Sequence, residues 1–132
     1  MIKSLWPAKG RAASAGQAAE DWAARFLDKQ GLNILTRNYR CRQGEVDIIA
    51  KRAELLVFVE VRLRNHRGFA SGLESVDQRK QQRLIKAASL YLHQHFGAAP
   101  PPCRFDVVSL ATKPDNGRSY DVHWIQDAFR PE

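Results

Sequence analysis

Two carboxylates that interrupt apolar stretches are the residues of this sequence best suited to chemistry. Asp47 lies in the segment Glu45–Ala50 and Glu60 lies in the segment Leu55–Arg62. Both segments are rich in β-branched residues and predict strands, which the short polar connection 51–54 joins as a β-hairpin. If the pairing register brings the two carboxylates together, they repel each other unless they share a cation or a proton. Mg²⁺ (or Mn²⁺) with oxygen ligands is the natural occupant of such a site.

A site of this kind suits phosphodiester hydrolysis, because a metal ion can polarise the phosphate and lower the pKa of an attacking water. Side chains alternate between the two faces of a strand. The faces expected to carry the site therefore hold Glu45, Asp47 and Ile49 on the first strand and Leu56, Phe58, Glu60 and Arg62 on the second. Glu45 is a further candidate metal ligand, and Arg62 is the cation expected to stabilise charge that develops on the phosphate.

The chain is basic, and its excess of positive charge is clustered. Its 132 residues include 21 Lys and Arg against 14 Asp and Glu, a net charge of +7. Residues 62–86 hold seven bases against two acids, a local net charge of +5. Such a cluster suits a polyanion, although a solvated basic face that only aids solubility has the same composition. The candidate nucleic-acid contacts in this segment are Arg64, Arg67, Arg79, Arg83 and Lys86.

Other features of the sequence argue against whole classes of protein. The longest unbroken apolar run, Leu55–Val59, is far too short to span a bilayer, and residues 1–6 lack the long apolar core of a secretory signal. Cys41 and Cys103 have neither a C-x-x-C partner nor metal-ligand spacing to a histidine. We therefore expect a cytoplasmic protein with reduced thiols and no membrane partner.

The periodic segments predict a single α/β domain over residues 14–132, preceded by a basic tail over residues 1–13. The long second helix can carry a crossover to a parallel strand, so we expect a central mixed sheet of four to five strands flanked by helices. The strands are expected at about 32–36, 45–50, 55–62, 105–110 and 120–125.

Capping signals predict where the two helices begin and end. In a capping box, Ser is followed three residues later by Gln or Glu, and a glycine often follows the last turn of a helix. The first helix is expected to begin after Ser14 and to stop at Gly31. The second is expected to begin after Ser75 and to run to about His95.

The two strand segments, Gly44–Ala50 and Val57–Arg62, resemble those of the YraN-type family of bacterial proteins. The resemblance covers residues 16 to about 129, nearly the whole chain. That family is in turn similar to the PD-(D/E)xK nuclease superfamily, nearest to archaeal-type Holliday junction resolvases. The other matching positions are Gly16, Glu20 and Ala23 in the first helix, the run Arg37–Arg40, Ser75 and Val76 with Lys80, and the run Arg104–Val108.

The resemblance implies a restriction-endonuclease-like fold with a helix packed on a central mixed sheet. It also implies Mg²⁺ coordination by the carboxylates that match Asp47 and Glu60, with a supporting carboxylate at Glu20. Resolvases of the superfamily act as dimers, which brings a homodimer into consideration here.

The sequence departs from the superfamily pattern D…(D/E)-x-K at one position, because Arg62 stands where the lysine is expected. Lysine can lose a proton when it is desolvated, whereas arginine in practice cannot. Arg62 can therefore hold a phosphate or orient a carboxylate, but it cannot serve as a general base. Lys80 is the candidate for a relocated amine.

Three hypotheses follow from this pattern. The first is a metal-dependent, structure-selective nuclease that acts on DNA, with the catalytic set Glu20, Asp47, Glu60, Arg62 and Lys80. The second is a non-catalytic nucleic-acid-binding module with a degenerate nuclease site. The third is an interaction protein whose basic face meets an acidic protein partner.

Overall fold

The computed structural model describes residues 14–64, 76–113 and 119–131, so the predicted tail 1–13 and Arg67 lie outside the described residues. The elements follow one another as α1 (Ala15–Lys29), β1 (Asn33–Cys41), β2 (Gly44–Arg52), β3 (Leu55–Arg64), α2 (Gln78–Phe96), β4 (Cys103–Thr112) and β5 (Tyr120–Phe129).

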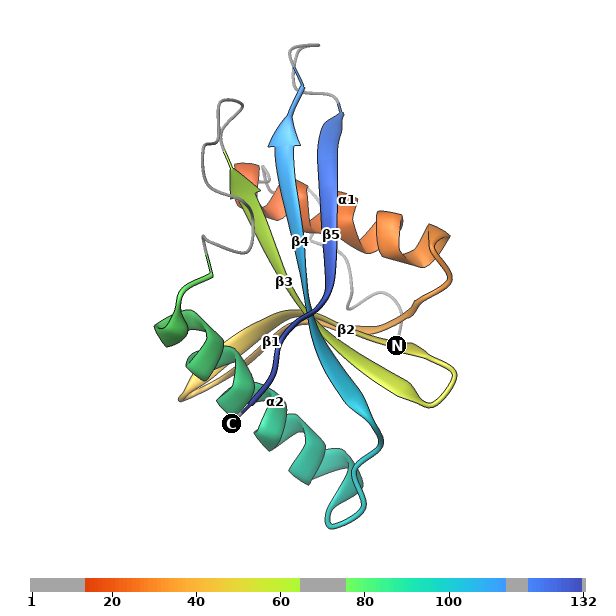
Figure 1. Cartoon of the computed structure of the whole chain (residues 1–132), viewed down its shortest axis with the longest axis vertical. Coiled ribbons are helices and arrows are strands. Elements are labelled where there is room, and N and C mark those ends of the chain that lie inside the picture. The colour runs from red at the N-terminus through yellow and green to blue at the C-terminus, as the bar shows by residue number, and fades with distance from the viewer. Residues whose placement is uncertain (1–13, 65–75, 114–118, 132) are drawn as a thin grey trace.

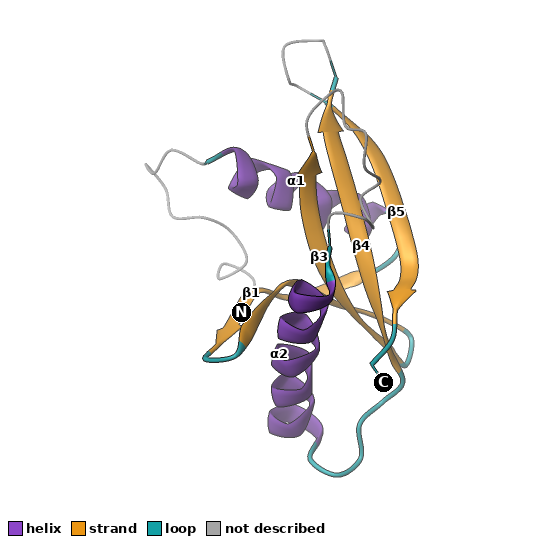
Figure 2. Cartoon of the chain, turned by 60° about the vertical axis from the view of Figure 1, so that its left-hand side comes forward, coloured by secondary structure: helices purple, strands orange, loops and turns teal. Residues whose placement is uncertain are grey.

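The five strands form one mixed sheet in the order β1-β2-β3-β4-β5. Only the β3–β4 pair is parallel, and α2 lies in the connection between these two strands, as a parallel pair requires. The sheet is strongly twisted, with α1 packed behind it and α2 packed in front (Figure 1, Figure 2). The chain is therefore an α/β protein whose five-stranded sheet is flanked by two helices, as the sequence predicts, and it is compatible with a restriction-endonuclease-like fold.

Each helix covers its own apolar cluster. On the α1 side, Leu27 packs with the inner residues of the sheet such as Ile48 and Val59, all fully buried. On the α2 side, Leu84 packs with Phe58 and Phe105. The two carboxylate-bearing strands, β2 and β3, take part in both clusters and are thus fixed from both faces.

The start of α1 is confirmed, and the start of α2 corrects the sequence prediction. The Oγ of Ser14 accepts a hydrogen bond of 3.1 Å from the Gln17 N–H, and Gly31 follows the helix with φ +97°. At α2 the cap is Asp77, whose carboxylate accepts from the Lys80 N–H at 2.9 Å. Aspartate is as good a cap as serine, so the helix begins later than the Ser75 motif predicts. Ser75 itself lies outside the described residues.

No helix within the described ranges is both long enough and apolar enough to cross a membrane.

The strands are longer than their apolar segments. β1, expected to end near residue 36, continues to Cys41 because it pairs with β2 through partners such as Tyr39 and Val46. β5, expected to end near residue 125, continues to Phe129, which pairs with Phe105. Both are edge strands, where one side of the backbone needs no partner and polar residues are tolerated. Pairing extends these strands beyond what composition indicates.

Candidate active site

The site begins where the regular β2–β3 pairing stops. The ladder runs from Arg52 opposite Leu55 to Ile48 opposite Val59. At the next residue of β2, the Asp47 carboxylate accepts a hydrogen bond of 2.9 Å from the backbone N–H of Val61. Asp47 is only 6% exposed, so this bond holds a nearly buried carboxylate against the backbone of β3.

The backbone around Asp47 departs from a simple strand. Strict alternation would place Val46 and Ile49 on opposite faces of the sheet, yet both pack in the cluster under α2. On the neighbouring strand, Asn38 has a left-handed φ of +54° and lies between the paired residues Arg37 and Tyr39. The expected grouping of Glu45, Asp47 and Ile49 on one face is therefore wrong, because the regular alternation of side chains between the two faces of the sheet is interrupted between Val46 and Ile49.

The structure brings Asp47 and Glu60 together as the sequence predicts. The two side chains lie close enough for the Asp47 carboxylate to raise the pKa of Glu60. Burial and the neighbouring Asp47 carboxylate raise the pKa of Glu60 to about 8. Burial also raises the pKa of Asp47, although the Val61 N–H opposes the shift. Two acidic neighbours of this kind repel each other unless they share a proton or a cation.

Glu20 extends the acidic cluster from α1. Burial, followed by the nearby Asp47 carboxylate, raises the pKa of Glu20 to about 7. Arg37, whose side chain is only 2% exposed, lies 2.7 Å from Asp21 and 3.8 Å from Glu20. This buried arginine on β1 fixes the first half of α1 beside the site and partly compensates the charge of Glu20.

Cationic side chains meet Glu60 in a cleft of about 310 Å³ between β3 and the first turns of α2. The Arg62 guanidinium lies 3.4 Å from the Glu60 carboxylate, and both side chains are mostly buried. Lys80 and Arg83 reach the same cleft from α2. An anion held by these cations would lie next to the carboxyl groups, which is the charge arrangement that a phosphate and a divalent cation need together.

Glu45 also lines this cleft, and it is the most exposed of the predicted acidic residues. Its side chain is about half exposed and lies 3.4 Å from the guanidinium of Arg40, which is itself largely in solvent. Its charge still contributes to raising the pKa of Asp47. Glu45 thus belongs to the rim of the site, whereas Glu60 lines the cleft with a mostly buried side chain and Asp47 lies next to Glu60, almost fully buried.

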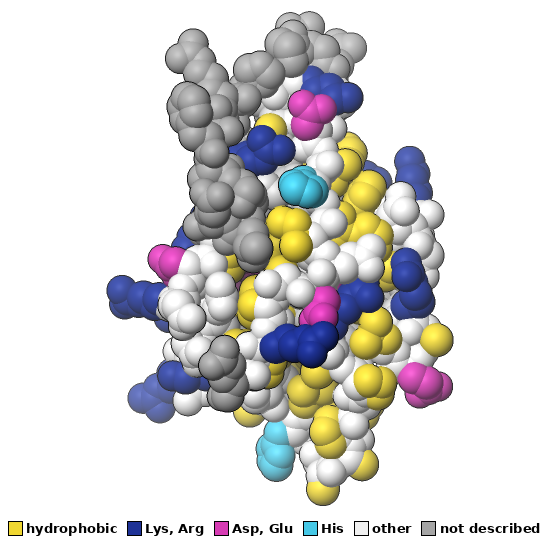
Figure 3. All heavy atoms as spheres, viewed as in Figure 1, with side chains coloured by type: hydrophobic (Ala, Val, Ile, Leu, Met, Phe, Trp, Pro, Cys, Tyr) yellow, Lys and Arg dark blue, Asp and Glu magenta, His cyan; other side chains and the backbone are white. Residues whose placement is uncertain are grey.

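The predicted nucleic-acid contacts divide between the cleft and its surroundings. Arg83 lines the cleft, while Arg79 and Lys86 are exposed on α2 outside it. Arg64 extends β3 beyond Arg62, and its Nε donates to the Oγ of Ser109 at 3.0 Å. Lys and Arg side chains project over the N-terminal half of α2 at the left edge of the molecule (Figure 3).

The sequence prediction assigns no role to three residues that the structure shows to be closely packed or buried. Gly44 is one of them, because a Cβ at this position would overlap the backbone carbonyl of Arg83, so only glycine lets β2 approach α2 this closely. Arg37 is the second, and nothing in its sequence context marks it as buried. The third is Asp106, a fully buried residue that accepts hydrogen bonds from Arg104, Trp124 and the Asp127 N–H.

The carboxyl groups of Asp47 and Glu60 fit Mg²⁺. They are adjacent and largely buried, and the charge of Asp47 raises the pKa of Glu60, an effect that a bound cation would oppose. Within the described ranges, no three His, Cys, Asp or Glu side chains are grouped so as to enclose a metal ion. Mg²⁺ is usually held by only one or two protein carboxylates and completes its shell with waters and substrate phosphates. Asp47 and Glu60 meet that requirement.

The fold and the cleft together define an α/β protein, compatible with the restriction-endonuclease-like class, with an acidic pair on the central strands and cations on the adjoining helix. The family model UPF0102, described as an uncharacterised protein family, matches residues 19–110. The chain belongs to this family, which is the YraN family that the sequence resembles.

Similar proteins from several bacteria match over most of their length. A UPF0102 protein of Pseudomonas putida strain W619 is 50% identical over 116 residues, which cover 88% of this chain and 93% of the relative. A UPF0102 protein of Stutzerimonas stutzeri is 49% identical over 116 residues, 88% of this chain and 94% of the relative. One from Alcanivorax borkumensis is 48% identical over 117 residues, 89% of this chain and 92% of the relative.

Proposed function

We propose that this protein is a Mg²⁺-dependent (or Mn²⁺-dependent) nuclease of the PD-(D/E)xK type that hydrolyses DNA phosphodiester bonds with selectivity for DNA structure. One observation carries the proposal: the nearly buried Asp47 lies next to Glu60, and Glu60 lines a cleft that also receives cations from two elements. Adjacent buried carboxylates repel each other unless they share a proton or a cation, and a bound cation would meet this requirement in the working state of the protein.

Asp47 and Glu60 would hold the metal, with Glu45 at the rim and Glu20 as a supporting carboxylate. When bound, Mg²⁺ would polarise the phosphate, lower the pKa of the attacking water and neutralise charge on the leaving oxygen. Asp47 is fixed for this role by the Val61 N–H, and Glu20 by the buried guanidinium of Arg37. These contacts keep the carboxylates in place before the substrate arrives.

The cations of the cleft would hold the phosphate. Arg62 is permanently charged beside Glu60, so it cannot transfer a proton to or from the substrate or water. Lys80 lines the same cleft and places an amine beside Glu60 and Arg62. We therefore assign to Lys80 the role of the lysine in the D…(D/E)-x-K pattern, whose own position is occupied by Arg62. Arg83 would contact a neighbouring phosphate.

The alternative is a nucleic-acid-binding module without catalysis, and a specific contact favours it. Arg62 forms an ion pair with Glu60, so an arginine occupies one side of a carboxylate that the metal requires. If this pair persists in the presence of Mg²⁺, the cleft would bind phosphate without activating water.

Cleavage separates the two functions. Wild type and Asp47→Asn are incubated with plasmid, linear, flap, junction and single-stranded DNA in Mg²⁺ or Mn²⁺, and binding is measured in parallel. We expect wild type to cleave at least one substrate and Asp47→Asn to bind it without cleaving, because the ligand is lost and the shape is kept. If both proteins bind equally and neither cleaves any substrate, the binding module replaces the nuclease.

A further inference from the structure

A second hollow lies beside α2, away from the acidic cleft. Its volume is about 270 Å³, and it is lined by Gln78, Gln81, Gln82, Ile85, Phe129 and Arg130. Three amide side chains, an aromatic ring and an arginine are the groups that proteins use to read and stack nucleobases. The role proposed above for the acidic cleft does not involve any of these residues.

The first turns of α2 separate the two hollows. At 100° per residue, Gln78, Gln81 and Ile85 share one side of the helix, whereas Lys80 and Leu84 face the other side. Arg79 and Lys86, both exposed, project between these two sides toward solvent. A helix with its side chains is about 10–12 Å wide, so a strand that crosses it spans on the order of three nucleotides at the B-form rise.

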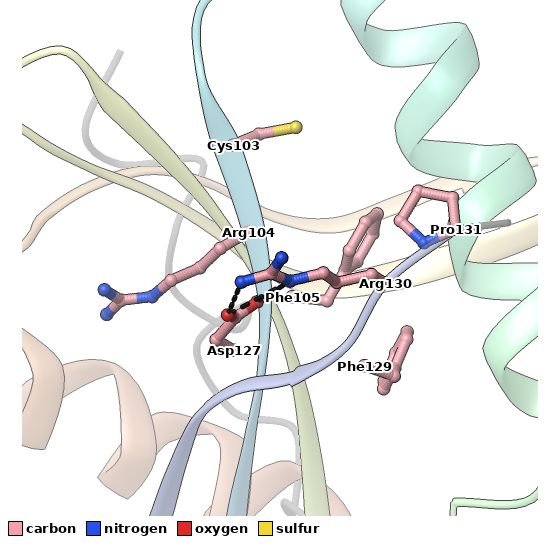
Figure 4. Close-up of a pocket in the computed structure, with 7 residues that line it drawn as sticks. All are labelled: Cys103, Arg104, Phe105, Asp127, Phe129, Arg130 and Pro131. Atoms are coloured by element: carbon pink, nitrogen blue, oxygen red, sulfur yellow. Dashed lines mark hydrogen bonds and ion pairs between the residues drawn. The ribbon is translucent and has the colours of Figure 1, made fainter.

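The aromatic ring of this hollow belongs to a stack that reaches the surface from the core. Phe58 and Phe105 stack with centroids 5.5 Å apart, and Phe105 and Phe129 stack 5.3 Å apart with planes only 17° from parallel. Phe129, the outer member, is partly exposed and points from β5 toward α2 (Figure 4). A nucleobase at this position would continue an existing stack, whose geometry the core already fixes.

Arg130 follows Phe129 and is held in place at the mouth of the hollow. Its side chain is 79% exposed, and its Nη2 lies 2.6 Å from the Asp127 carboxylate (Figure 4). The same two residues also line a further hollow of about 340 Å³, together with residues that include Phe105 and Pro131. Phe129 and Arg130 thus border two hollows.

We infer that the hollow at Phe129 binds an unstacked nucleobase of a single-stranded segment, about three nucleotides from the phosphate in the acidic cleft. The backbone of that segment would cross α2 over Arg79 and Lys86. The inference rests on the proposed function, which supplies the DNA strand that this hollow would bind. It narrows the proposed substrate to DNA with a single-stranded region. A base inside a continuous duplex cannot enter the hollow without being flipped out of its stack.

The test uses a set of single-stranded oligodeoxynucleotides in which one 2-aminopurine is moved along the sequence, bound to the full-length protein in EDTA so that no metal-dependent cleavage occurs. Stacking on an aromatic ring quenches this fluorophore. We expect quenching on binding to wild type, and we expect Phe129→Leu to abolish it and to weaken binding about tenfold. Phe96→Leu is the matched control, since Phe96 is 39% exposed at the far end of α2 and should leave both signals unchanged.

Gln82→Ala provides a second variant that should not affect folding, because the Gln82 side chain is exposed. It should weaken single-strand binding several-fold while the melting temperature stays the same. The inference is overturned if Phe129→Leu and Gln82→Ala bind and quench like wild type. It is also overturned if wild type cleaves duplex or junction DNA but does not bind the single strand, a result that would leave the nuclease proposal standing.

Discussion

Asp47 and Asp106 have similar sequence contexts, but their carboxylates have different hydrogen-bond partners in the fold. Each is an aspartate inside an apolar strand segment, and each is almost fully buried. Asp106 accepts two hydrogen bonds from Arg104 and one each from Trp124 and the Asp127 N–H, so its charge is compensated within the fold. Asp47 has one backbone donor and a second carboxyl group as its neighbour. The uncompensated aspartate is the one suited to bind a cation.

Arg62 is the residue that most directly tests how the cleft works. It is a fixed charge 3.4 Å from Glu60, so Arg62→Ala should reduce cleavage about 10²–10³-fold through lost stabilisation of developing negative charge. Arg62→Lys should keep much of the activity, because a cation remains on the same face of β3. Rates of metal-dependent cleavage measure both effects. Lys51→Ala is the control, because it removes an exposed cation from β2 outside the cleft, and it should cleave like wild type. If Arg62→Ala has normal activity, Arg62 takes no part in the mechanism.

The raised pKa values of the acidic cluster predict how stability depends on pH. Folding raises the pKa of Glu60 from 4.5 to about 8 and that of Glu20 to about 7, so the folded chain binds more protons than the unfolded chain across this range. The stability that these groups contribute is complete below pH 4.5 and is lost as pH rises toward 8. In the absence of metal, the melting temperature should therefore fall over that interval, and Glu60→Gln should reduce the fall.

Mg²⁺ should reverse this loss, because it binds the deprotonated carboxylates of the folded chain. The rise in melting temperature on adding Mg²⁺ should be larger at pH 8 than at pH 6, and it should disappear in Asp47→Asn. Thermal unfolding monitored by circular dichroism at both pH values supplies the measurement. An equal rise at the two pH values, or a rise that survives in Asp47→Asn, would show that the ion binds elsewhere.

At the scale of elements, one glycine sets the distance between β2 and α2. A Cβ at Gly44 would overlap the Arg83 carbonyl, so Gly44→Ala must push the helix away from the strand that carries Glu45 and Asp47. We expect a loss of stability of about 1–3 kcal/mol and a fall in cleavage on the order of 10²-fold, since a small displacement of positioned groups has effects of this size. Chemical denaturation measures the loss of stability, and cleavage rates measure the fall in activity.

Gly16→Ala is the matched control for that change. A Cβ at Gly16 would meet only the Ser14 Oγ at 3.9 Å, an ordinary contact, and alanine favours a helix over glycine. This variant should be as stable as wild type or slightly more stable. If Gly44→Ala is equally harmless, the close approach of β2 and α2 does not position the site.

The elements were largely predictable from sequence, whereas their exact extents were not. Apolar periodicity and capping residues located both helices and all five strands. The ends of β1 and β5 depend on partners far along the chain, and Asp77 replaced the expected cap of α2. Periodicity cannot reveal these features, because they are decided by pairing and packing between elements.

The acidic pair was predictable because antiparallel neighbours in a tight hairpin have a register that short connections fix. The cleft was only partly predictable. Lys80 and Arg83 lie more than 15 residues from Glu60 in the chain, and α2 brings them to it by crossing the face of the sheet. The buried Arg37 was not predictable, because an arginine on an edge strand is ordinarily exposed.

At the scale of the whole molecule, the proposed function predicts that the net charge of +7 matters most where it lies near the acidic cleft. Arg79, Lys80 and Arg83 belong to the first turns of α2, beside or within the cleft. Each phosphate that these cations neutralise releases condensed counterions, so binding must weaken as salt rises. Replacing all three by Gln should flatten the plot of log K against log salt by about 2–3 units.

The control for this change carries the same loss of charge elsewhere on the surface. Lys29, Lys51 and Arg52 are exposed bases at the end of α1 and at the end of β2 far from the cleft. Their replacement by Gln lowers the net charge equally and should change the slope by much less than one unit. Fluorescence anisotropy of labelled DNA across a salt series measures both proteins. If the two triple variants have the same slope, charge acts through the whole molecule and α2 is not the contact surface. If only the α2 variant is flattened, the phosphates of the substrate lie along the helix that borders the acidic pair.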